Sequence, residues 1–253
     1  MKEALLSIIK DENRIITGQI DPQYLSDNLG RKKGTAEAVV FPISTEEVSG
    51  VMRYAWKNNL PVTPRGAGTN LVGSTVPSGH GIVLDVMNHV LELDEETFTA
   101  TVEPGVVLED FQAYVESKGL FYPPDPGEKK ATIGGNISTN AGGMRAVKYG
   151  VTRDYVMGGE LVLADGTVVM AGSKNRKDTS GLDLKEIVIG SEGTLAVITK
   201  CILKLIPKPE DSLSVLLSFD SLKAGIESVR QIIQANLNPT AMEFIERKVI
   251  QLG

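Results

Sequence analysis

The chain contains 253 residues, 42% of them apolar and 23% charged, and its formal net charge is −6. This composition is ordinary for a globular protein with a buried core, while the acidic balance and the lack of a long basic stripe argue against nucleic-acid binding. No apolar run approaches the ~20 residues of a membrane-spanning helix, which leaves only peripheral contact with a membrane, and the single cysteine, Cys201, favours a reducing, cytoplasmic compartment because it has no partner for an intrachain disulfide.

The first half of the chain alternates short apolar strands with helices. Residues 1–10 have the pattern of an amphipathic helix. Ser44 followed by Glu47 is a capping-box signature, which predicts a helix that ends near Asn58 and carries Trp56, where we expect core or interface packing. A further helix is expected over residues 107–118, with Gly119 as the residue that ends it. Strands are expected over residues 38–42, 60–64, 81–86, 90–94 and 98–102.

The second half of the chain reads as strands, a linker and then a new unit. Asp165-Gly166 predicts a type I′ turn in a hairpin over residues 161–169. Later segments are a short helix or strand over residues 184–189, a long strand over 195–206 and a linker over 205–211. A strand at 213–219, a helix at 221–235 and a strand at 242–245 would begin a βαβ-like unit. That unit lacks a partner before Gly253, so we expect a shortened chain or a split gene.

Residues 65–74 form a Gly-x-Gly-x-x-x-x-Gly segment that follows a predicted strand. A Rossmann loop would open a helix, and no helical pattern follows here. A Walker loop would need Gly-Lys-Ser/Thr, which is also missing. Successive backbone N–H groups in such turns form concave nests that hold anions, and Arg65 is the only charged residue between Pro61 and Gly81. We therefore predict a phosphate-binding loop between two strands.

A second glycine-rich segment, residues 131–144, contains no charged residue. Its small, neutral, hydrogen-bonding side chains suit contact with a flat heteroaromatic ring or a dinucleotide backbone. The windows 65–74, 127–150 and 190–193 together hold eleven of the 26 glycines in 38 residues. Glycines that serve only turns would be spread more evenly, so the windows predict a chain that wraps a large phosphate-bearing cofactor.

The remaining chemistry-bearing residues point to structural roles. His80 and His89 are the only histidines, and we expect a turn residue and a strand-edge residue. Two scattered histidines cannot make a metal cluster, so no metal site is predicted. Cys201 lies in an apolar run and is predicted to be a small buried side chain. No catalytic residue can be identified in the sequence.

Several motifs, in order between about Ala36 and Pro207, together resemble the FAD-binding domain of the vanillyl-alcohol oxidase / p-cresol methylhydroxylase (PCMH) superfamily. The motifs are residues 64–69, 124–126 with 132–136, 140–143 with 148–154, and 190–195. Within the superfamily they are most similar to the branch of glycolate oxidase FAD subunits, D-lactate dehydrogenases and D-2-hydroxyglutarate dehydrogenases. The resemblance implies an α+β fold with a PCMH-type FAD-binding domain of two α/β subdomains over residues 36–207. An N-terminal helical segment (1–35) would precede it, and the start of a C-terminal substrate (cap) domain (212–253) would follow.

The resemblance also implies which residues contact FAD. For the diphosphate these are Arg65, Gly66, Ala67, Gly68, Thr69, Asn70, Gly73 and Ser74. For the flavin and ribityl chain they are Asp125, Thr132, Ile133, Gly134, Gly135, Ser138, Thr139, Asn140, Gly142 and Gly143, with Pro124 and Gly150 as further cofactor-binding positions. Toward the adenosine they are Glu192, Gly193 and Ile198. Some relatives attach FAD through a histidine in the first loop, where this chain has Ala67 and Thr69, so non-covalent FAD is expected.

The function implied by the resemblance is oxidation of a D-2-hydroxy acid, such as glycolate or D-lactate, by hydride transfer to flavin N5. The family's catalytic histidine, carboxylate site and metal site lie on the cap domain, so this chain would supply the FAD-binding part and be inactive alone. Arg145 and Lys148 are weak candidates for contacting the anionic substrate, with solvated surface positions as the favoured account. The implied partner is an electron-acceptor protein or an iron–sulfur subunit.

Two alternatives stay open. One is a non-catalytic FAD-binding or interaction subunit of a multi-subunit oxidoreductase. The other is a reductase of the same fold that uses NADPH on a cell-wall nucleotide, which the hydroxy-acid-like motifs disfavour. A His-x-Gly-Asp-Gly-Asn segment beyond Gly253 would favour the enzyme over the non-catalytic subunit.

Overall fold

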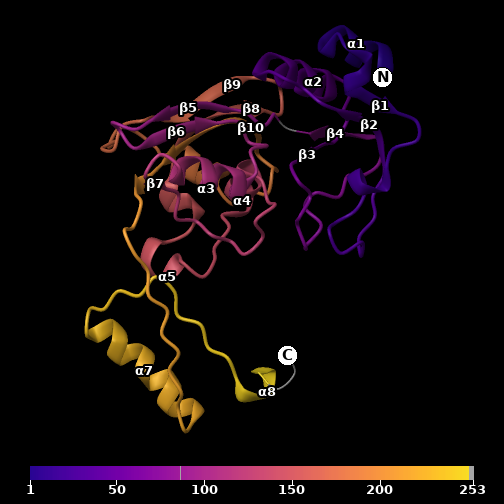
Figure 1. The fold of residues 1–253 in the computed structure, drawn as a ribbon. Helices are drawn as coiled ribbons and strands as arrows, with labels where there is room; N and C mark the ends of the chain where they lie inside the picture. Colours follow the sequence, from indigo (N-terminus) through magenta and orange to yellow (C-terminus); the bar gives the residue numbers. More distant parts are fainter. Residues whose placement is uncertain (86, 251–253) are drawn as a thin grey trace.

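Two β-sheets, each with its own helices, organise the body of the protein, and the computed structural model describes residues 1–85 and 87–250 (Figure 1). The first sheet has the order β1-β2-β4-β3, with β2 and β3 parallel to β4 and β1 antiparallel to β2. Helix α2 connects β2 to β3 on the other side of β4, and the parallel neighbours β3 and β4 are joined by the loop over residues 66–80. The strands are β1 (Ile15–Thr17), β2 (Ala36–Val40), β3 (Val62–Arg65) and β4 (Gly81–Asp85).

The helices of the first subdomain are α1 (Lys2–Ile9) and α2 (Thr45–Lys57), with short 3₁₀ turns at Glu12–Arg14 and Pro22–Tyr24. The apolar faces of both helices share a core with the sheet. Ser44 caps α2 by accepting a hydrogen bond from the backbone N–H of Glu47 (3.3 Å). Arg14 pairs with the Glu47 carboxylate (2.6 Å) and donates to the carbonyl of Phe41 (3.1 Å). The N-terminal segment is therefore tied to the first sheet.

The second sheet is antiparallel, with the order β5-β6-β10-β8-β9. Its strands are β5 (Val90–Asp94), β6 (Thr99–Val102), β8 (Val156–Leu163), β9 (Val168–Gly172) and β10 (Ala196–Lys204). One face packs against α3 (Leu108–Glu116) and α4 (Ile133–Thr139) around the fully buried Phe111, Tyr122 and Leu203. Smaller elements are β7 (Leu120–Phe121), which pairs with β11 (Ile206–Pro207), α5 (Ala146–Tyr149), a 3₁₀ turn at Thr152–Tyr155 and α6 (Lys185–Val188).

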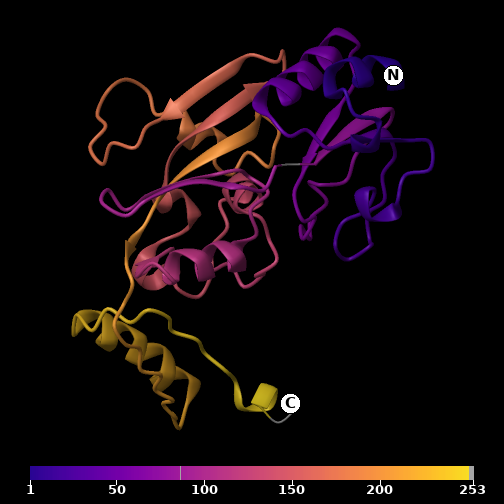
Figure 2. The ribbon, with the colours of Figure 1, turned by 45° about the horizontal axis from the view of Figure 1, so that its top comes forward.

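Helix α2 also joins the two subdomains (Figure 2). Val162 of β8 and Val197 of β10 belong to the same buried apolar cluster as Val48 and Val51 of α2. The hydroxyl of Thr45, at the start of α2, donates a hydrogen bond to the carboxylate of Glu160 on β8. Helix α2 thus packs against strands of both sheets within one apolar cluster, and this fixes the relative position of the two sheets.

The fold confirms the predicted α+β class with two subdomains, and it corrects two local predictions. Trp56 does not pack in the core, because 61% of its surface is exposed on α2, so of its two expected roles only interface packing stays a prediction. The Asp165-Gly166 turn is not type I′. A type I′ turn needs positive φ at both central residues. Gly166 has φ 86°, but Asp165 is not among the described residues with positive φ. Gly166 N–H donates to the Leu163 carbonyl (2.9 Å), so a type I turn is followed by a left-handed glycine.

The predicted strand over 81–86 ends at Asp85 in the structure, and Val86 lies outside the described residues.

The C-terminal part differs most from the sequence-based expectation. Leu205 is fully buried and Ile206–Pro207 form β11, so the predicted linker over 205–211 begins only after Pro207. Helix α7 (Leu222–Gln234) forms as predicted, but residues 213–219 and 242–245 are not strands, and α8 covers Arg247–Ile250. A strand needs a neighbour for its backbone hydrogen bonds, and residues 208–250 lead away from both sheets (Figure 1). No helix in the described ranges is long and apolar enough to cross a membrane.

Candidate cofactor-binding site

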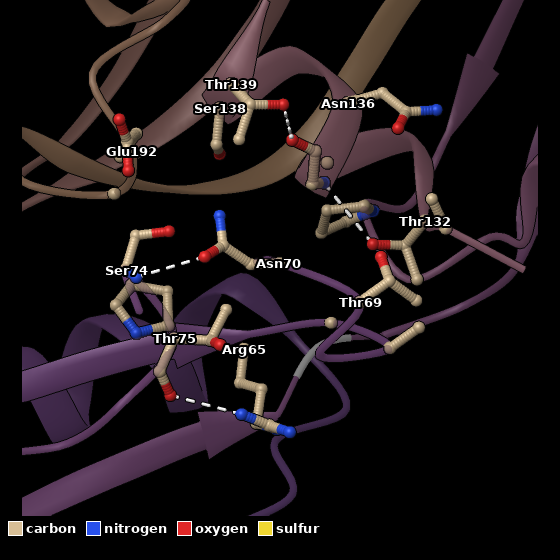
Figure 3. Close-up of a pocket in the computed structure, with 18 of the residues that line it drawn as sticks. Arg65, Thr69, Asn70, Ser74, Thr75, Thr132, Asn136, Ser138, Thr139 and Glu192 are labelled. Carbon is tan, nitrogen blue, oxygen red and sulfur yellow. Dashed lines mark hydrogen bonds between the residues drawn. The ribbon is translucent and has the colours of Figure 1, made fainter. Parts of the chain in front are cut away.

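A cavity of about 250 Å³ is lined by both subdomains. Its walls come from the loop between β3 and β4, from the segment that leads into and forms α4, and from the segment that enters β10 (Figure 3). Fifteen of the predicted cofactor residues line it: Arg65, Gly66, Ala67, Gly68, Thr69, Asn70, Ser74, Thr132, Gly134, Gly135, Ser138, Thr139, Glu192, Gly193 and Ile198. The structure therefore brings together segments that are far apart in the sequence.

Eight predicted residues lie outside the lining: Gly73, Pro124, Asp125, Ile133, Asn140, Gly142, Gly143 and Gly150. Ile133 is fully buried in the core of the second subdomain. Asp125 is 7% exposed and forms ion pairs with Lys129 and with Nε of Arg145, the latter at 3.2 Å. The carboxylate of Asp125 is thus held by side chains of its own subdomain.

The glycines of the lining allow a close approach of backbone segments. A Cβ on Gly66 would overlap the hydroxyl of Thr132, and a Cβ on Gly134 would lie 2.5 Å from the Cβ of Pro104. Gly68 has φ 71°, and a Cβ there would overlap the guanidinium of Arg65. Only the approach of Gly66 to Thr132 joins the two subdomains, and a side chain at Gly66 would push these walls apart, whereas Gly68 and Gly134 allow close packing within their own subdomains.

Arg65 lies under the loop rather than across the cavity. Its guanidinium donates to the carbonyls of Ser26 (3.2 Å), Thr75 (3.1 Å) and Gln23 (2.6 Å). Only 8% of the residue is exposed, and this burial lowers the pKa of its guanidinium. The side chain therefore fixes the loop to the segment before β2, and its guanidinium is held by these carbonyls.

The backbone N–H groups of the loop fall into two sets. Those of Val72 (2.8 Å), Gly73 (2.8 Å) and Ser74 (3.2 Å) donate to the side-chain oxygen Oδ1 of Asn70. Those of residues 66–69 make no hydrogen bond to any described part of the chain. An anion in the cavity would thus be held by the first half of the loop, residues 66–69, as a backbone nest.

Helix α4 forms the opposite wall and was missed by the sequence analysis. It begins at Ile133, where Thr132 Oγ1 accepts from the Gly135 N–H (3.3 Å), and it ends at Asn140 in the left-handed conformation (φ 46°). Two adjacent glycines in a seven-residue helix argue against helix on propensity. The signal that could have found it is the threonine cap, because Ser and Thr favour the position before a helix.

Ala141, within the stretch 138–143 expected at the flavin, also lines the cavity, and nine further lining residues were not predicted: Pro64, Thr75, Pro104, Pro126, Glu128, Ala131, Asn136, Ala196 and Val197. Most are neighbours of predicted residues, whereas Pro104 comes from the loop after β6 and carried no signal in the sequence. The hydroxyl Oγ1 of Thr75 is buried and has no hydrogen-bond partner among the described residues. Such an atom is costly unless a bound molecule satisfies it.

The other candidate residues lie outside the cavity lining. Arg145 stacks over the ring of Phe121 (5.0 Å) and Lys148 over that of Tyr149 (5.1 Å). His80 pairs with Glu37, and Nδ1 of His89 lies 2.7 Å from Glu103. In the ranges that the structure describes, no group of histidine, cysteine and acidic residues is arranged to hold a metal ion. Cys201 is buried, as predicted, and burial raises the pKa of its thiol.

A cavity lined mainly by bare backbone and small hydrogen-bonding side chains, between two α/β subdomains, is typical of a protein that binds a nucleotide cofactor. FAD fits the residues present, because the backbone N–H groups of residues 66–69 have no partner in the described chain and the buried Thr75 hydroxyl, on a residue of the same lining, also lacks one. Residues 36–172 match the family described as FAD binding domain, and residues 208–253 match the C-terminal domain of FAD linked oxidases. The chain therefore belongs to the FAD-linked oxidases that carry this FAD-binding domain.

Individual relatives agree with this family. The chain is 44% identical to the glycolate oxidase subunit GlcD of Bacillus subtilis (strain 168), covering 99% of this chain and 54% of the relative. It is also 44% identical to a D-lactate dehydrogenase of Anaerostipes hadrus (94% and 51% covered) and 37% identical to a probable mitochondrial D-2-hydroxyglutarate dehydrogenase of Oryza sativa subsp. indica (97% and 44% covered). The chain thus spans about half the length of these relatives.

Solved structures show the same fold. An alkyldihydroxyacetonephosphate synthase superposes with a TM-score of 0.76 at 23% identity, over 90% of this chain and 44% of that one. The resemblance noted in the sequence is confirmed at the level of family and fold.

Proposed function

We propose that the chain binds FAD non-covalently and is the FAD-binding part of an enzyme that oxidises a D-2-hydroxy acid such as glycolate or D-lactate. The observation that carries the proposal is the glycine-rich lining of the cavity between the two subdomains, at the residues that the family motifs mark. Relatives named glycolate oxidase subunit and D-lactate dehydrogenase support the substrate class. We take residues 36–207 as the FAD-binding domain and 212–253 as the start of the substrate domain.

The lining residues support non-covalent binding. They include no histidine, cysteine or tyrosine, so no side chain there is suited to bond the flavin. Bound FAD supplies the two-electron acceptor for the oxidation. The backbone of residues 66–69 would hold the diphosphate of FAD, while Gly135, Ser138 and Thr139 of α4 would contact the flavin and ribityl chain.

The substrate half of the site is proposed to come from sequence equivalent to the second half of the relatives. The only acid–base side chains of the described lining are Glu128 and Glu192, and no histidine is among them. A base for the substrate hydroxyl would then lie on the C-terminal domain, of which residues 208–253 are the matched part. A further subunit or electron-acceptor protein fits the name of the Bacillus subtilis relative.

The test is anaerobic bleaching of flavin in the protein reconstituted with FAD and supplied with the remaining C-terminal domain sequence. We expect one of D-lactate, glycolate and D-2-hydroxyglutarate to bleach the flavin absorbance, and L-lactate, as the stereochemical control, to leave it unchanged. Flavin that binds but is bleached by none of the three acids would contradict the enzyme and favour a non-catalytic FAD-binding subunit. Bleaching by NADPH alone would favour a reductase of this fold instead.

A further inference from the structure

Two loop tips of the first subdomain lie side by side and carry exposed aliphatic side chains. One tip is the turn that contains Leu29, and the other is the part of the β3–β4 loop that contains Leu71 and Val72. The backbone N–H of Asn28 donates to the carbonyl of Asn70 (3.2 Å), and both loops extend to the same end of the subdomain (Figures 1 and 2). Leu29 is 47% exposed, Leu71 58% and Val72 64%. Three apolar side chains therefore gather at one place on the surface.

A run of three cations, Arg31, Lys32 and Lys33, follows the first tip. All three residues are exposed. The ammonium Nζ of Lys32 reaches the second tip, where it donates to the carbonyl of Val72 (3.0 Å). The side chains of Arg31 and Lys33 form no ion pair within residues 1–85 and 87–250. Two unpaired cations thus lie beside the apolar side chains.

The segments that carry the two tips contain no acidic residue. Residues 28–36 and 66–84 include no aspartate or glutamate, although the whole chain carries a net charge of −6. Asp27, just before the first tip, is only 4% exposed, and its carboxylate accepts from the backbone N–H of Arg31 (2.9 Å) inside the turn. The next acidic residue, Glu37, forms an ion pair with a histidine. The surface around the tips is therefore positive in an otherwise acidic protein.

We propose that these two loop tips, with their apolar side chains and their three cations, form a docking surface for an anionic lipid membrane. Aliphatic side chains at a loop tip can enter the headgroup region, while the cations beside them attract the charged lipid headgroups. A protein–protein interface is typically centred on tryptophan or tyrosine, and residues 28–36 and 66–84 contain no aromatic side chain. The inference goes beyond the proposed function and does not depend on the identity of the cofactor.

The docking surface and the cavity share one loop. Asn70 and Ser74 line the cavity, whereas Leu71 and Val72, which lie between them in the sequence, are exposed to solvent. A docked chain would thus hold the cavity close to the membrane surface. Because the attraction is partly electrostatic, the attachment would be reversible and would weaken as the salt concentration rises.

Two pairs of substitutions separate the charges from the apolar contact. Arg31→Gln with Lys33→Gln removes the two unpaired cations and leaves Lys32 on its carbonyl. Leu29→Ser with Leu71→Ser shortens one apolar side chain on each tip. None of these residues lines the cavity, so both double variants should bind FAD with the affinity of the wild type and melt at the same temperature.

Matched controls make the same changes elsewhere on the surface. Arg176→Gln with Lys177→Gln removes an exposed basic pair from another loop. Leu213→Ser with Leu216→Ser shortens two leucines that are 88% and 93% exposed. The second control is needed because exposed leucines in the C-terminal part could themselves adsorb to lipid.

The measurement is co-sedimentation of the chain with vesicles of phosphatidylglycerol and phosphatidylcholine, compared with vesicles of phosphatidylcholine alone. We expect the wild type to bind the anionic vesicles more tightly and to be released at high salt. Each cation near such a surface contributes about a fivefold gain, so the charge variant should lose about 25-fold in vesicle affinity. The apolar variant should lose about 10-fold, and the two controls should match the wild type.

A wild type without preference for the anionic vesicles would overturn the inference. A loss in the controls equal to that in the tip variants would also overturn it, because the contact would then not lie at the tips. Salt-sensitive binding to polyglutamate without binding to vesicles would assign the surface to an acidic protein instead. If the chain fails to bind FAD, the proposed function is contradicted, but the vesicle result stands independently.

Discussion

At the scale of single residues, an arginine in a glycine-rich loop can either bind the phosphate of a ligand or stabilise the loop itself. A phosphate-binding arginine would be needed only when the cofactor is present. Arg65 instead donates to the carbonyls of Ser26, Thr75 and Gln23 in the protein itself. We expect Arg65→Lys to lower the free energy of unfolding of the apo protein by about 2–3 kcal/mol, because a single ammonium cannot replace a fork that reaches three carbonyls.

Chemical denaturation of the apo protein measures this loss. Arg31→Lys is the control: Arg31 is exposed and its side chain makes no hydrogen bond in the described structure, so a change within about 0.5 kcal/mol is expected. If Arg65→Lys leaves apo stability unchanged but weakens FAD, then Arg65 acts on the cofactor directly and the structural role given to it here is wrong.

At the scale of elements, the sequence predicted those segments whose local pattern and tertiary surroundings agree. Helix α2 has both a cap at Ser44 and an apolar face, and its predicted bounds match the structure. Helix α4 was missed because its glycines contradict helix propensity, and it is held by its cap and by burial of Ile133 and Ile137. The strands expected over 213–219 and 242–245 did not form. An apolar segment favours a strand, but the strand forms only where a neighbouring strand pairs with its backbone.

The same reasoning applies to the site. Glycine spacing placed most of the lining in advance, since bare backbone is a property of the sequence itself. It could not show that Arg65 turns beneath the loop, nor that Pro104 enters the cavity from the loop after β6, because both depend on how the two sheets pack.

Helices α2 and α7 allow a direct test of what stabilises an element in this fold. Both have 13 residues and a serine cap, but α2 buries six residues and α7 buries only Gly225. An isolated helix of this length is marginal in water, since most helical stability comes from packing. We expect the amides of Leu222–Gln234 to exchange with deuterium orders of magnitude faster than those of Thr45–Lys57. Equal protection of the two helices, read by mass spectrometry of peptides from each, would contradict this account.

At the scale of the whole molecule, the cavity depends on the joint between the two subdomains, where Glu160 is the central polar group. Its carboxylate accepts from Thr45 of the first subdomain and from Thr199 (3.1 Å), and it pairs with Lys200 (3.0 Å). Burial alone would raise the pKa of Glu160, but the hydrogen bonds from Thr45, Lys200 and Thr199 outweigh it and hold the pKa below its ordinary value. The joint is therefore built for a charged carboxylate.

This direction of the pKa shift sets how the stability of the joint depends on pH. The pKa of glutamate in the unfolded state is about 4.3. A carboxyl whose pKa is lower in the folded state stabilises the fold at pH values above the unfolded pKa. This contribution is lost as the pH falls through the folded pKa. Glu160→Gln should thus lower the free energy of unfolding by about 1–3 kcal/mol at pH 7, and the gap to the wild type should close on acidification below about pH 4. Denaturant titrations at several pH values, with the exposed Glu210→Gln as control for the lost charge, measure both quantities. A gap that stays constant with pH would mean that packing of α2 against Val162 and Val197, rather than the carboxylate, holds the two walls of the cavity together.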